Sequence, residues 1–471
     1  MELSKSSIRI FLSRAGSAII QFVGIVVFSR AFGASDIGVF FLFQATLAIL
    51  AFPADFGVMR AVEKRISENQ QAVPSLVASG AILKIVILLL VTVAIHFNSD
   101  WINQYIGADV AHLLIIALVV QESGRFLIHV LKGNFRVGET AIFELGKYSI
   151  WLILGVVVVR VGMGVRALIV SLILGLSFVP LLAYPRIDTG LGTPSVEHVK
   201  SLYHFIKYNF VSQIGGQFYS WMDVAIIGLL LTQADVAAYE VAWKITGFVT
   251  LLSAAIATTI FPQVSEWSSK GENNNIQQML HDFSVPALYF VIPSFFGSII
   301  LAEDILRIVF GTEFSVAWTV FIILMFEKIF HSLHMLFGRS LIAINKPDLS
   351  ARATVFAVTV NLLLNFALIP HFGIMGAAIA TTTSFLLEFV INLVYLSRYI
   401  NISLPFAEIR VLTISGLLMT ASLYGINTYV QVNNYVALGL MILTGAVIYI
   451  STSFASTSVR DTMVRFTRNA L

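Results

Sequence analysis

The sequence predicts an all-α integral membrane protein with about fourteen transmembrane helices. Of its 471 residues, 58% are hydrophobic and only 12% are charged. The mean hydropathy of +0.88 is far above that of a soluble domain with a polar surface. Apolar runs of about 20 residues, long enough to cross a bilayer as helices, recur with short polar breaks between them. No soluble domain fits in what remains.

The first predicted span is expected to stay uncleaved, because Arg14 interrupts its apolar run and no small-residue cleavage site follows. The chain contains no cysteine, which excludes disulfides, cysteine-zinc sites and iron-sulfur clusters. The predicted spans cover residues 8–32, 37–58, 76–97, 110–131, 141–160, 164–184, 203–231, 236–261, 283–302, 314–343, 352–370, 374–397, 407–429 and 435–455.

Basic residues in the loops predict the orientation of these spans, because cytoplasmic loops of membrane proteins are enriched in lysine and arginine. With both termini in the cytoplasm, eighteen basic residues fall in inner segments. Only four fall in outer loops, namely Arg30, Arg160, Arg166 and Arg307. The net charge of +3 therefore reflects membrane topology and does not indicate nucleic-acid binding.

An internal repeat relates the two halves of the chain. The segment 36–40 (DIGVF) matches 235–239 (DVAAY) at an offset of 199 positions, and Gly164-Val165 matches Gly373-Ile374 at 209. Because six spans separate the copies, both have the same orientation, as in other two-lobed transporters. We expect an N-lobe at 1–184, a linker at 185–202, a C-lobe at 203–398, and two further helices with the tail at 399–471.

Two polar stripes follow the helical period and coincide under the same offset. The first comprises Arg14, Ser17, Gln21 and Gly24, and the second comprises Asn209, Gln213, Gly216, Ser220 and Asp223. We interpret both stripes as the lining of a polar cavity between the lobes. The alternative is that they only hold helices together through interhelical hydrogen bonds.

Charged residues within predicted spans need a partner, a water-filled cavity or a function. Three pairs have the spacing that allows neutralisation on one helix face: Glu122 with Arg125, Glu144 with Lys147, and Glu240 with Lys244. Arg14, Lys84 and Asp223 have no such neighbour. Glu327 and Lys328 are adjacent and are expected to point about 100° apart. Lys84 and Lys147 lie near enough to the cytoplasmic ends to snorkel, and Glu388 is expected to pair across helices.

Several motifs resemble those of a known family. Asn345-Lys346-Pro347, the pair Asn361 and Asn365, and the segment 369–381 (IPHFGIMGAAIAT) are similar to the eleventh and twelfth spans of polysaccharide-type lipid flippases. The segments 29–40 (SRAFGASDIGVF) and 55–57 (DFG) resemble that family's first loop and second span. The resemblance covers nearly the whole chain and identifies it as a member of the multidrug/oligosaccharidyl-lipid/polysaccharide (MOP) exporter superfamily, which implies a MATE-like fold.

The resemblance implies a flippase for surface polysaccharide biosynthesis, such as O-antigen of lipopolysaccharide, capsule or exopolysaccharide. Such a protein moves a polyprenyl-(pyro)phosphate-linked oligosaccharide across the inner (plasma) membrane of a prokaryote by alternating access, and it is not an enzyme. Expected partners are the lipid-linked oligosaccharide, membrane lipids, and a polymerase with other glycan-assembly proteins. No cofactor is expected beyond a H⁺ or Na⁺ gradient.

The anionic headgroup of such a substrate needs charge-assisted hydrogen bonds to cross the bilayer. Asp223, Glu327 and Glu122 are the candidates for taking up a coupling ion. The candidate substrate-binding residues of the cavity are Arg14, Gln21, Lys84, Arg125, Gln213, Lys244 and Lys328.

Alternative functions remain open at this stage. A multidrug or small-molecule cation antiporter and a lipid II flippase share the expected fold. A membrane glycan polymerase or ligase, the least favoured, would carry a larger outer loop, and a scaffold would not need charges within its spans. ATP hydrolysis is excluded because Gly146-Lys147 lacks the rest of a phosphate-binding loop. No metal site is expected, although His331 and His334 are spaced to share a helix face.

Overall fold

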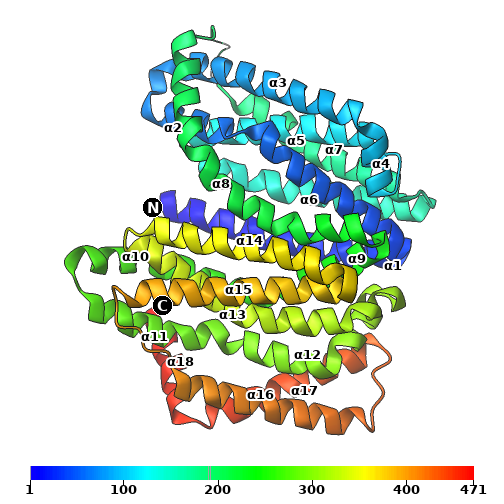
Figure 1. The fold of residues 1–471 in the computed structure, drawn as a ribbon, viewed down its shortest axis with the longest axis vertical. Coiled ribbons are helices and arrows are strands. Elements are labelled where there is room, and N and C mark those ends of the chain that lie inside the picture. The colour runs from blue at the N-terminus through cyan, green and yellow to red at the C-terminus, as the bar shows by residue number, and fades with distance from the viewer. Residues whose placement is uncertain (1, 189, 191, 471) are drawn as a thin grey trace. The chain divides into compact units, whose positions relative to one another are not determined.

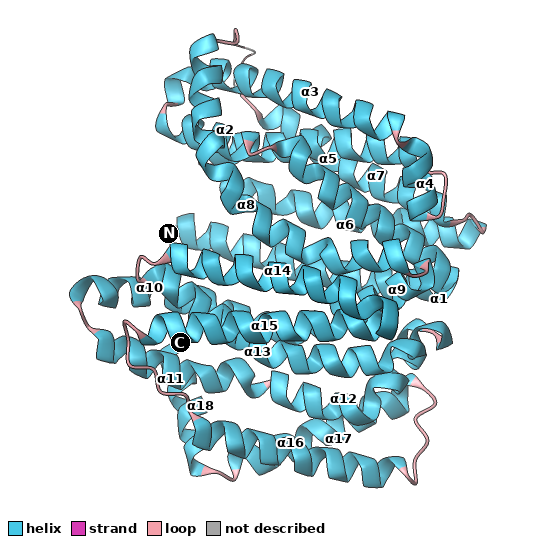
Figure 2. Cartoon of the chain, in the orientation of Figure 1, coloured by secondary structure: helices cyan, strands magenta, loops and turns pink. Residues whose placement is uncertain are grey.

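The protein, described here from a computed structural model, is built of helices joined by short loops, as Figure 2 shows. The structure describes the backbone of residues 2–188, 190 and 192–470. It describes the side chains in these ranges except those of 2–12, 14, 207–219 and 467–470. Within the described chain every regular element is an α, 3-10 or π helix, which confirms the predicted all-α class.

The chain divides into two compact units, Met1–Ala237 and Ala238–Leu471, called here the first and the second unit (Figure 1). The first unit contains α1 (Glu2–Asp55), α2 (Val58–Glu68), α3 (Val73–Phe97), α4 (Ser99–Ile106), α5 (Ala111–Gly133), α6 (Ala141–Val161), α7 (Val165–Ala183) and α8 (Val196–Leu230). Helix α9 (Gln233–Gly247) begins in the first unit and ends in the second. The predicted lobes, with a linker at 185–202, stay a prediction.

The second unit contains most of the remaining spans. Its helices are α10 (Leu251–Lys270), α11 (Asn273–Tyr289), α12 (Val291–Ile305), α13 (Trp318–Ala343), α14 (Pro347–Phe372), α15 (Ile374–Ser397), α16 (Phe406–Asn427), α17 (Tyr435–Phe454) and α18 (Thr457–Ala470). The segment 263–282 is helical except at Gly271 and Glu272. Helix α10 extends beyond its apolar part, where Glu266 and Lys270 form an i,i+4 ion pair.

Twelve helical segments among the described residues are long and apolar enough to cross a membrane, which confirms a multi-pass membrane protein. One of them, Ala15–Asp55, covers the two predicted spans 8–32 and 37–58. Within α1, Gly33 has a φ of 78° and a ψ of 174°, a conformation that glycine adopts readily and that interrupts the helix between these spans. The count of fourteen spans stays a prediction.

Helices of the first unit approach closely at glycines. A Cβ on Gly24 of α1 would lie 2.5 Å from the Trp151 ring of α6, and a Cβ on Gly155 would lie 2.3 Å from the Phe28 ring. Small residues at such points let neighbouring helices pack without a gap, which matters in a bilayer because burial from water does not drive helix association there. Helices α1 and α6 are therefore fixed against each other.

The segment 345–383 forms two helices that pack along each other, α14 and α15. Asn361 donates from Nδ2 to Thr381 Oγ1 at 3.1 Å, and Asn365 donates from Nδ2 to Asn361 Oδ1 at 2.8 Å. Both asparagines are buried, so this face of α14 packs within the protein. Gly373, with a φ of 57°, separates the two helices. Pro370 lies inside α14, two residues before its end at Phe372.

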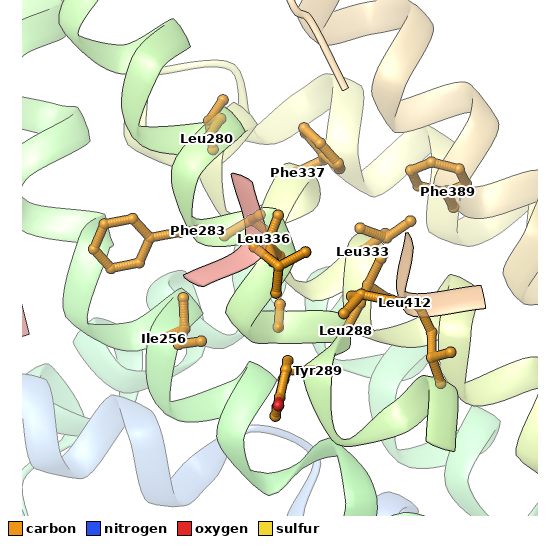
Figure 3. Close-up of a cluster of buried hydrophobic side chains, with 14 of the residues drawn as sticks. Ile256, Leu280, Phe283, Leu288, Tyr289, Leu333, Leu336, Phe337, Phe389 and Leu412 are labelled. Carbon is orange, nitrogen blue, oxygen red and sulfur yellow. The ribbon is translucent and has the colours of Figure 1, made fainter. Parts of the chain in front are cut away.

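A cluster of buried apolar side chains forms the core of the second unit (Figure 3). Ile256 of α10, Phe283 of α11, Leu336 of α13, Phe389 of α15 and Leu412 of α16 belong to it. Dispersion contacts among these buried side chains hold the five helices together. The rigid frame that results supports the charged side chains that α13 and α15 carry.

Candidate functional site

Three charged side chains meet inside the first unit. Glu122 of α5 is fully buried, and its two carboxylate oxygens face different cations. One oxygen accepts a hydrogen bond from the ammonium of Lys84 on α3, and the other lies 3.0 Å from Nη1 of Arg125 one turn further along α5. Glu122 therefore connects α3 to α5, which are in contact in the fold (Figure 1).

Lys84 is held by further groups from α1. Its ammonium donates to the carbonyl of Ala54 at 2.8 Å and lies 3.5 Å from a carboxylate oxygen of Asp55. Lys84 is only 5% exposed. The prediction that Lys84 snorkels to the membrane surface was therefore wrong. Its partner Glu122 lies two helices further along the chain, and the spacing of residues within one helix did not indicate this contact. The predicted pair of Glu122 and Arg125 is confirmed.

Two polar cavities of about 260 and 270 Å³ lie beside this cluster. Both are lined by Ala48 and Ala51 of α1 and by Arg125, so Arg125 is the charged residue that the two cavities share. The first cavity also contains Glu144 and Lys147, whose predicted i,i+3 pair is confirmed at 2.8 Å. The second cavity is also lined by Phe52, Asp55, Arg60, His129 and Lys132.

The lining of the two cavities carries more positive than negative charge. The cations are Arg60, Arg125, Lys132 and Lys147, and the carboxylates are Asp55 and Glu144. Arg125 is 38% exposed, and a guanidinium has five N–H donors in a planar fork. While one edge faces Glu122, the other is free to face the cavities. This arrangement suits an anion such as a phosphate.

The sequence reasoning missed His129, and it used Arg60 and Lys132 only to assign topology. A signal was present, because Glu122, Arg125, His129 and Lys132 are spaced 3, 4 and 3 residues apart and so follow one face of α5. His129 lies 2.5 Å from Glu63 of α2. This hydrogen bond lowers the pKa of the Glu63 carboxyl below its ordinary value. The stripe on α5 thus runs from the buried cluster toward the charged helix α2.

The structure describes the side chains of only some residues in the two predicted polar stripes. Arg14 and Gln213 lie outside the residues whose side chains the structure describes. Gln21 donates to the carbonyl of Ser17 in its own helix at 3.2 Å, and Gly24 packs on α6 as described above. Asp223 is buried within the first unit. At Gly24, helix packing alone explains the small residue.

A second charged cluster lies in the second unit, on α13. Glu327 and Lys328 are buried, and Lys328 Nζ lies 2.6 Å from Glu327 Oε2 and 3.6 Å from the centre of the Trp243 ring. The two side chains were expected to point apart. The two side chains meet because both are long enough to bend toward each other. The ammonium of Lys328 is stabilised further because it lies over the aromatic face of Trp243. The predicted pair of Glu240 and Lys244 is confirmed at 2.8 Å.

Comparisons with known proteins agree with these features. A family model described as "Polysaccharide biosynthesis protein" matches residues 27–319. The chain is 45% identical over 462 residues to the probable low-salt glycan biosynthesis flippase Agl15 of Haloferax volcanii, with 98% of each chain covered. It is 28% identical to the probable flippase AglR of the same organism, with 91% of each chain covered.

Solved structures show the same fold. The lipid II flippase MurJ in an inward closed conformation matches with a TM-score of 0.82 over 97% of this chain and all of that one, at 17% identity. An inward-facing multidrug resistance transporter of the MATE family matches with a TM-score of 0.62 over 81% of this chain and 94% of that one, at 15% identity. These likenesses show that the chain has the fold of MurJ and of MATE transporters. The matched relatives from Haloferax volcanii are named as flippases and not as enzymes. The chain therefore belongs to the polysaccharide biosynthesis protein family.

Proposed function

We propose that this chain is a flippase that moves a polyprenyl-(pyro)phosphate-linked oligosaccharide from the inner to the outer face of a prokaryotic plasma membrane. It acts by alternating access, with both termini in the cytoplasm, and supplies glycan-assembly proteins such as a polymerase. The observation that carries the proposal is the pair of cation-rich cavities that share Arg125 in their linings. The glycan biosynthesis flippase among its relatives supports the same substrate class.

The headgroup is the part of this substrate that cannot cross a bilayer unaided. Its phosphates carry negative charge, and losing their hydration without replacement would be prohibitive. Arg125 replaces water by charge-assisted hydrogen bonds, and Arg60, Lys132 and Lys147 compensate the charge around it. The polyprenyl tail stays in the lipid beside the protein.

The buried carboxylate of Glu122 keeps this binding from becoming too strong. It shares the charge of Lys84 and Arg125, so the phosphate competes with a permanent anion for the guanidinium. A site of this kind binds a headgroup and still releases it on the other side. We propose further contacts with the substrate for five other residues, Arg14, Gln21, Gln213, Lys244 and Lys328.

The charge of the cavities separates the proposed substrate from that of a multidrug antiporter. An organic cation would be repelled by the excess of arginine and lysine, whereas an anionic lipid headgroup is attracted. Lipid II has the same pyrophosphate chemistry, so a flippase for it would use the same cations. The two substrates differ in the group that the pyrophosphate carries, which is a peptidoglycan precursor in one and an oligosaccharide repeat unit in the other.

Replacing Arg125 with alanine is expected to abolish surface glycan while the lipid-linked intermediate accumulates on the cytoplasmic side. The measurement is glycan staining of intact cells together with mass spectrometry of extracted lipids. Arg352→Ala is the matched control, because Arg352 is exposed and pairs with Asp348 in its own helix. It should leave both quantities unchanged.

Wild-type surface glycan in Arg125→Ala cells with normal protein levels would remove Arg125 from the site. An accumulated lipid that carries a peptidoglycan precursor, and not an oligosaccharide repeat unit, would identify the chain as a lipid II flippase instead.

A further inference from the structure

Two kinds of polar side chain follow one face of helix α5. Gln121 and Arg125 line the cavity of about 260 Å³, here called the amide cavity. Arg125, His129 and Lys132 line the cavity of about 270 Å³, here called the cationic cavity. With a rise of about 1.5 Å per residue, Gln121 lies roughly 6 Å from Arg125 along the helix axis, and Lys132 lies roughly 10 Å from it in the other direction. Arg125 thus stands between an amide and a further cation.

The cationic cavity has uncompensated positive charge. Among the described residues, neither Arg60 nor Lys132 forms an ion pair with a carboxylate. The carboxylate of the lining, Asp55, lies 3.5 Å from the ammonium of Lys84. Together with Arg125, two unpaired cations therefore surround one space. Such a set suits a group with several negative charges, as a pyrophosphate has.

The charges around the amide cavity cancel. Glu144 and Lys147 form an ion pair at 2.8 Å, and Arg125 faces Glu122 at 3.0 Å. The remaining polar group is Gln121, whose amide has no hydrogen-bond partner in the part of the chain that the structure describes. An amide offers both N–H donors and an acceptor oxygen, so it binds hydroxyl and acetamido groups alike. The amide cavity therefore suits an uncharged polar group.

The rest of the amide cavity is apolar. This part of the lining comprises Ala48 and Ala51 of α1, Ile128 of α5, and Leu176 and Val179 of α7. A sugar ring has C–H groups on its faces and hydroxyl groups around its edge, so it needs both kinds of lining. The volume of about 260 Å³ lies below the roughly 300–1,000 Å³ of sites for drug-sized ligands. The cavity therefore has room for one sugar ring and not for an oligosaccharide.

The order of the groups along α5 matches the order of the groups in the proposed substrate. In a polyprenyl-linked oligosaccharide, the first sugar is joined to a phosphate through one oxygen atom. The two cavities share Ala48, Ala51 and Arg125, so they are neighbours. A phosphate held by Arg125 and the cationic cavity therefore places the first sugar beside the amide cavity.

We propose that the amide cavity binds the first sugar of the substrate and selects an uncharged sugar, a hexose or an N-acetylhexosamine, over a uronic acid. The proposal rests on the proposed flippase function, which supplies the phosphate end of the substrate. Gln121 exchanges hydrogen bonds with the substituents of the ring. A uronic acid would bring its carboxylate toward Glu144, where Lys147 is already paired.

The sugar site is tested by calorimetric binding to the purified full chain in detergent. Three probes share one short polyprenyl pyrophosphate: the first carries no sugar, the second N-acetylglucosamine and the third glucuronic acid. We expect the wild-type chain to bind the second probe about tenfold more tightly than the first, because two hydrogen bonds between neutral groups contribute about this factor. It should bind the third probe about two- to fivefold more weakly than the second, as expected for partly exposed charges.

Gln121→Leu keeps the approximate volume of the side chain and removes its amide. In this variant we expect the ratio of the affinities for the N-acetylglucosamine probe and the sugar-free probe to fall to about one. Gln104→Leu is the matched control, because Gln104 is an exposed glutamine on α4, outside both cavities. Its ratio should stay at about ten. Gln121→Ala provides a second variant if leucine lowers the yield of folded protein.

Glu144→Gln tests the selection for an uncharged sugar. Without its partner, Lys147 is free to meet the carboxylate of glucuronic acid, so the preference for the N-acetylglucosamine probe over the glucuronic acid probe should disappear or reverse. Glu266→Gln is the matched control, because Glu266 also pairs with a lysine of its own helix, Lys270, but outside the cavities. It should keep the wild-type preference.

Equal wild-type affinities for the probes with and without N-acetylglucosamine, or a wild-type ratio in both Gln121 variants, would overturn the sugar site. Wild-type binding of glucuronic acid as tight as that of N-acetylglucosamine would overturn the selection for an uncharged sugar. A chain that binds the sugar-free probe and gains nothing from the sugar loses only the sugar site, whereas a chain that binds none of the probes loses the proposed headgroup site as well.

Discussion

Replacing Glu122 with glutamine is expected to cause one of the two largest losses of stability among single substitutions in this chain. In this variant Lys84 stays buried, but the carboxylate that accepted its hydrogen bond is replaced by an uncharged amide. One of the two carboxylate oxygens becomes an NH₂ group, which donates hydrogen bonds and cannot accept them. The substitution also removes the partner of Arg125. Breaking a buried ion pair by removing one partner costs about 3–5 kcal/mol. Asp55, 3.5 Å from Lys84, retains part of the attraction. The measurement is the unfolding midpoint of the purified protein in detergent.

The control for this prediction is Glu68→Gln on α2. Glu68 also faces one lysine and one arginine, Lys64 at 2.9 Å and Arg65 at 2.7 Å, but Glu68 and Lys64 are exposed and Arg65 is only half-buried. Such surface pairs contribute about 1 kcal/mol or less. Equal midpoints for Glu122→Gln and Glu68→Gln would show that the buried cluster does not hold α3 to α5.

Gly38→Ala is expected to disrupt the packing of α1 against the start of α9 in the first unit. A Cβ at position 38 would lie 1.7 Å from the carbonyl oxygen of Gln233, at the start of α9. A backbone oxygen cannot rotate away as a flexible side chain can. Overpacking costs about 1–3 kcal/mol where neighbours yield, and more where they do not. We expect little folded protein, measured as the monodisperse fraction in size-exclusion chromatography.

Gly425→Ala in α16 is the matched control for Gly38→Ala. Its Cβ would meet no atom within 4 Å, so the substitution should be neutral or stabilise the helix by up to about 1 kcal/mol. If Gly38→Ala behaved like Gly425→Ala, the close contact between α1 and α9 would not exist in the folded protein.

Composition and helical period were enough to predict the class of the fold and most of its elements. A run of about 20 apolar residues has few alternatives to a membrane helix, which explains why the predicted spans fall on helices. The same periodicity predicted ion pairs within one helix, as for Glu240 with Lys244.

The sequence predicted that Glu388 pairs across helices, which Thr354 of α14 confirms, but the partners in contacts between helices were beyond its reach. Lys84 and Glu122 are 38 positions apart, and nothing in their spacing indicates that α3 and α5 bring them together. The bend that joins Glu327 to Lys328 and the approach of His334 to Glu388 likewise depend on tertiary packing. The stripe through Arg125, His129 and Lys132 could have been found, since it follows the helical period.

The central claim is that cations around Arg125 hold an anionic headgroup during transport. The most direct measurement compares two lipids in proteoliposomes that contain the purified full chain. One is a short-chain polyprenyl pyrophosphate-linked N-acetylglucosamine, and the other carries the same sugar and chain without phosphates. We predict that only the first crosses the bilayer faster than in protein-free vesicles, and that Arg125→Ala removes this difference. Equal rates for both lipids, or an unchanged rate with Arg125→Ala, would contradict the claim.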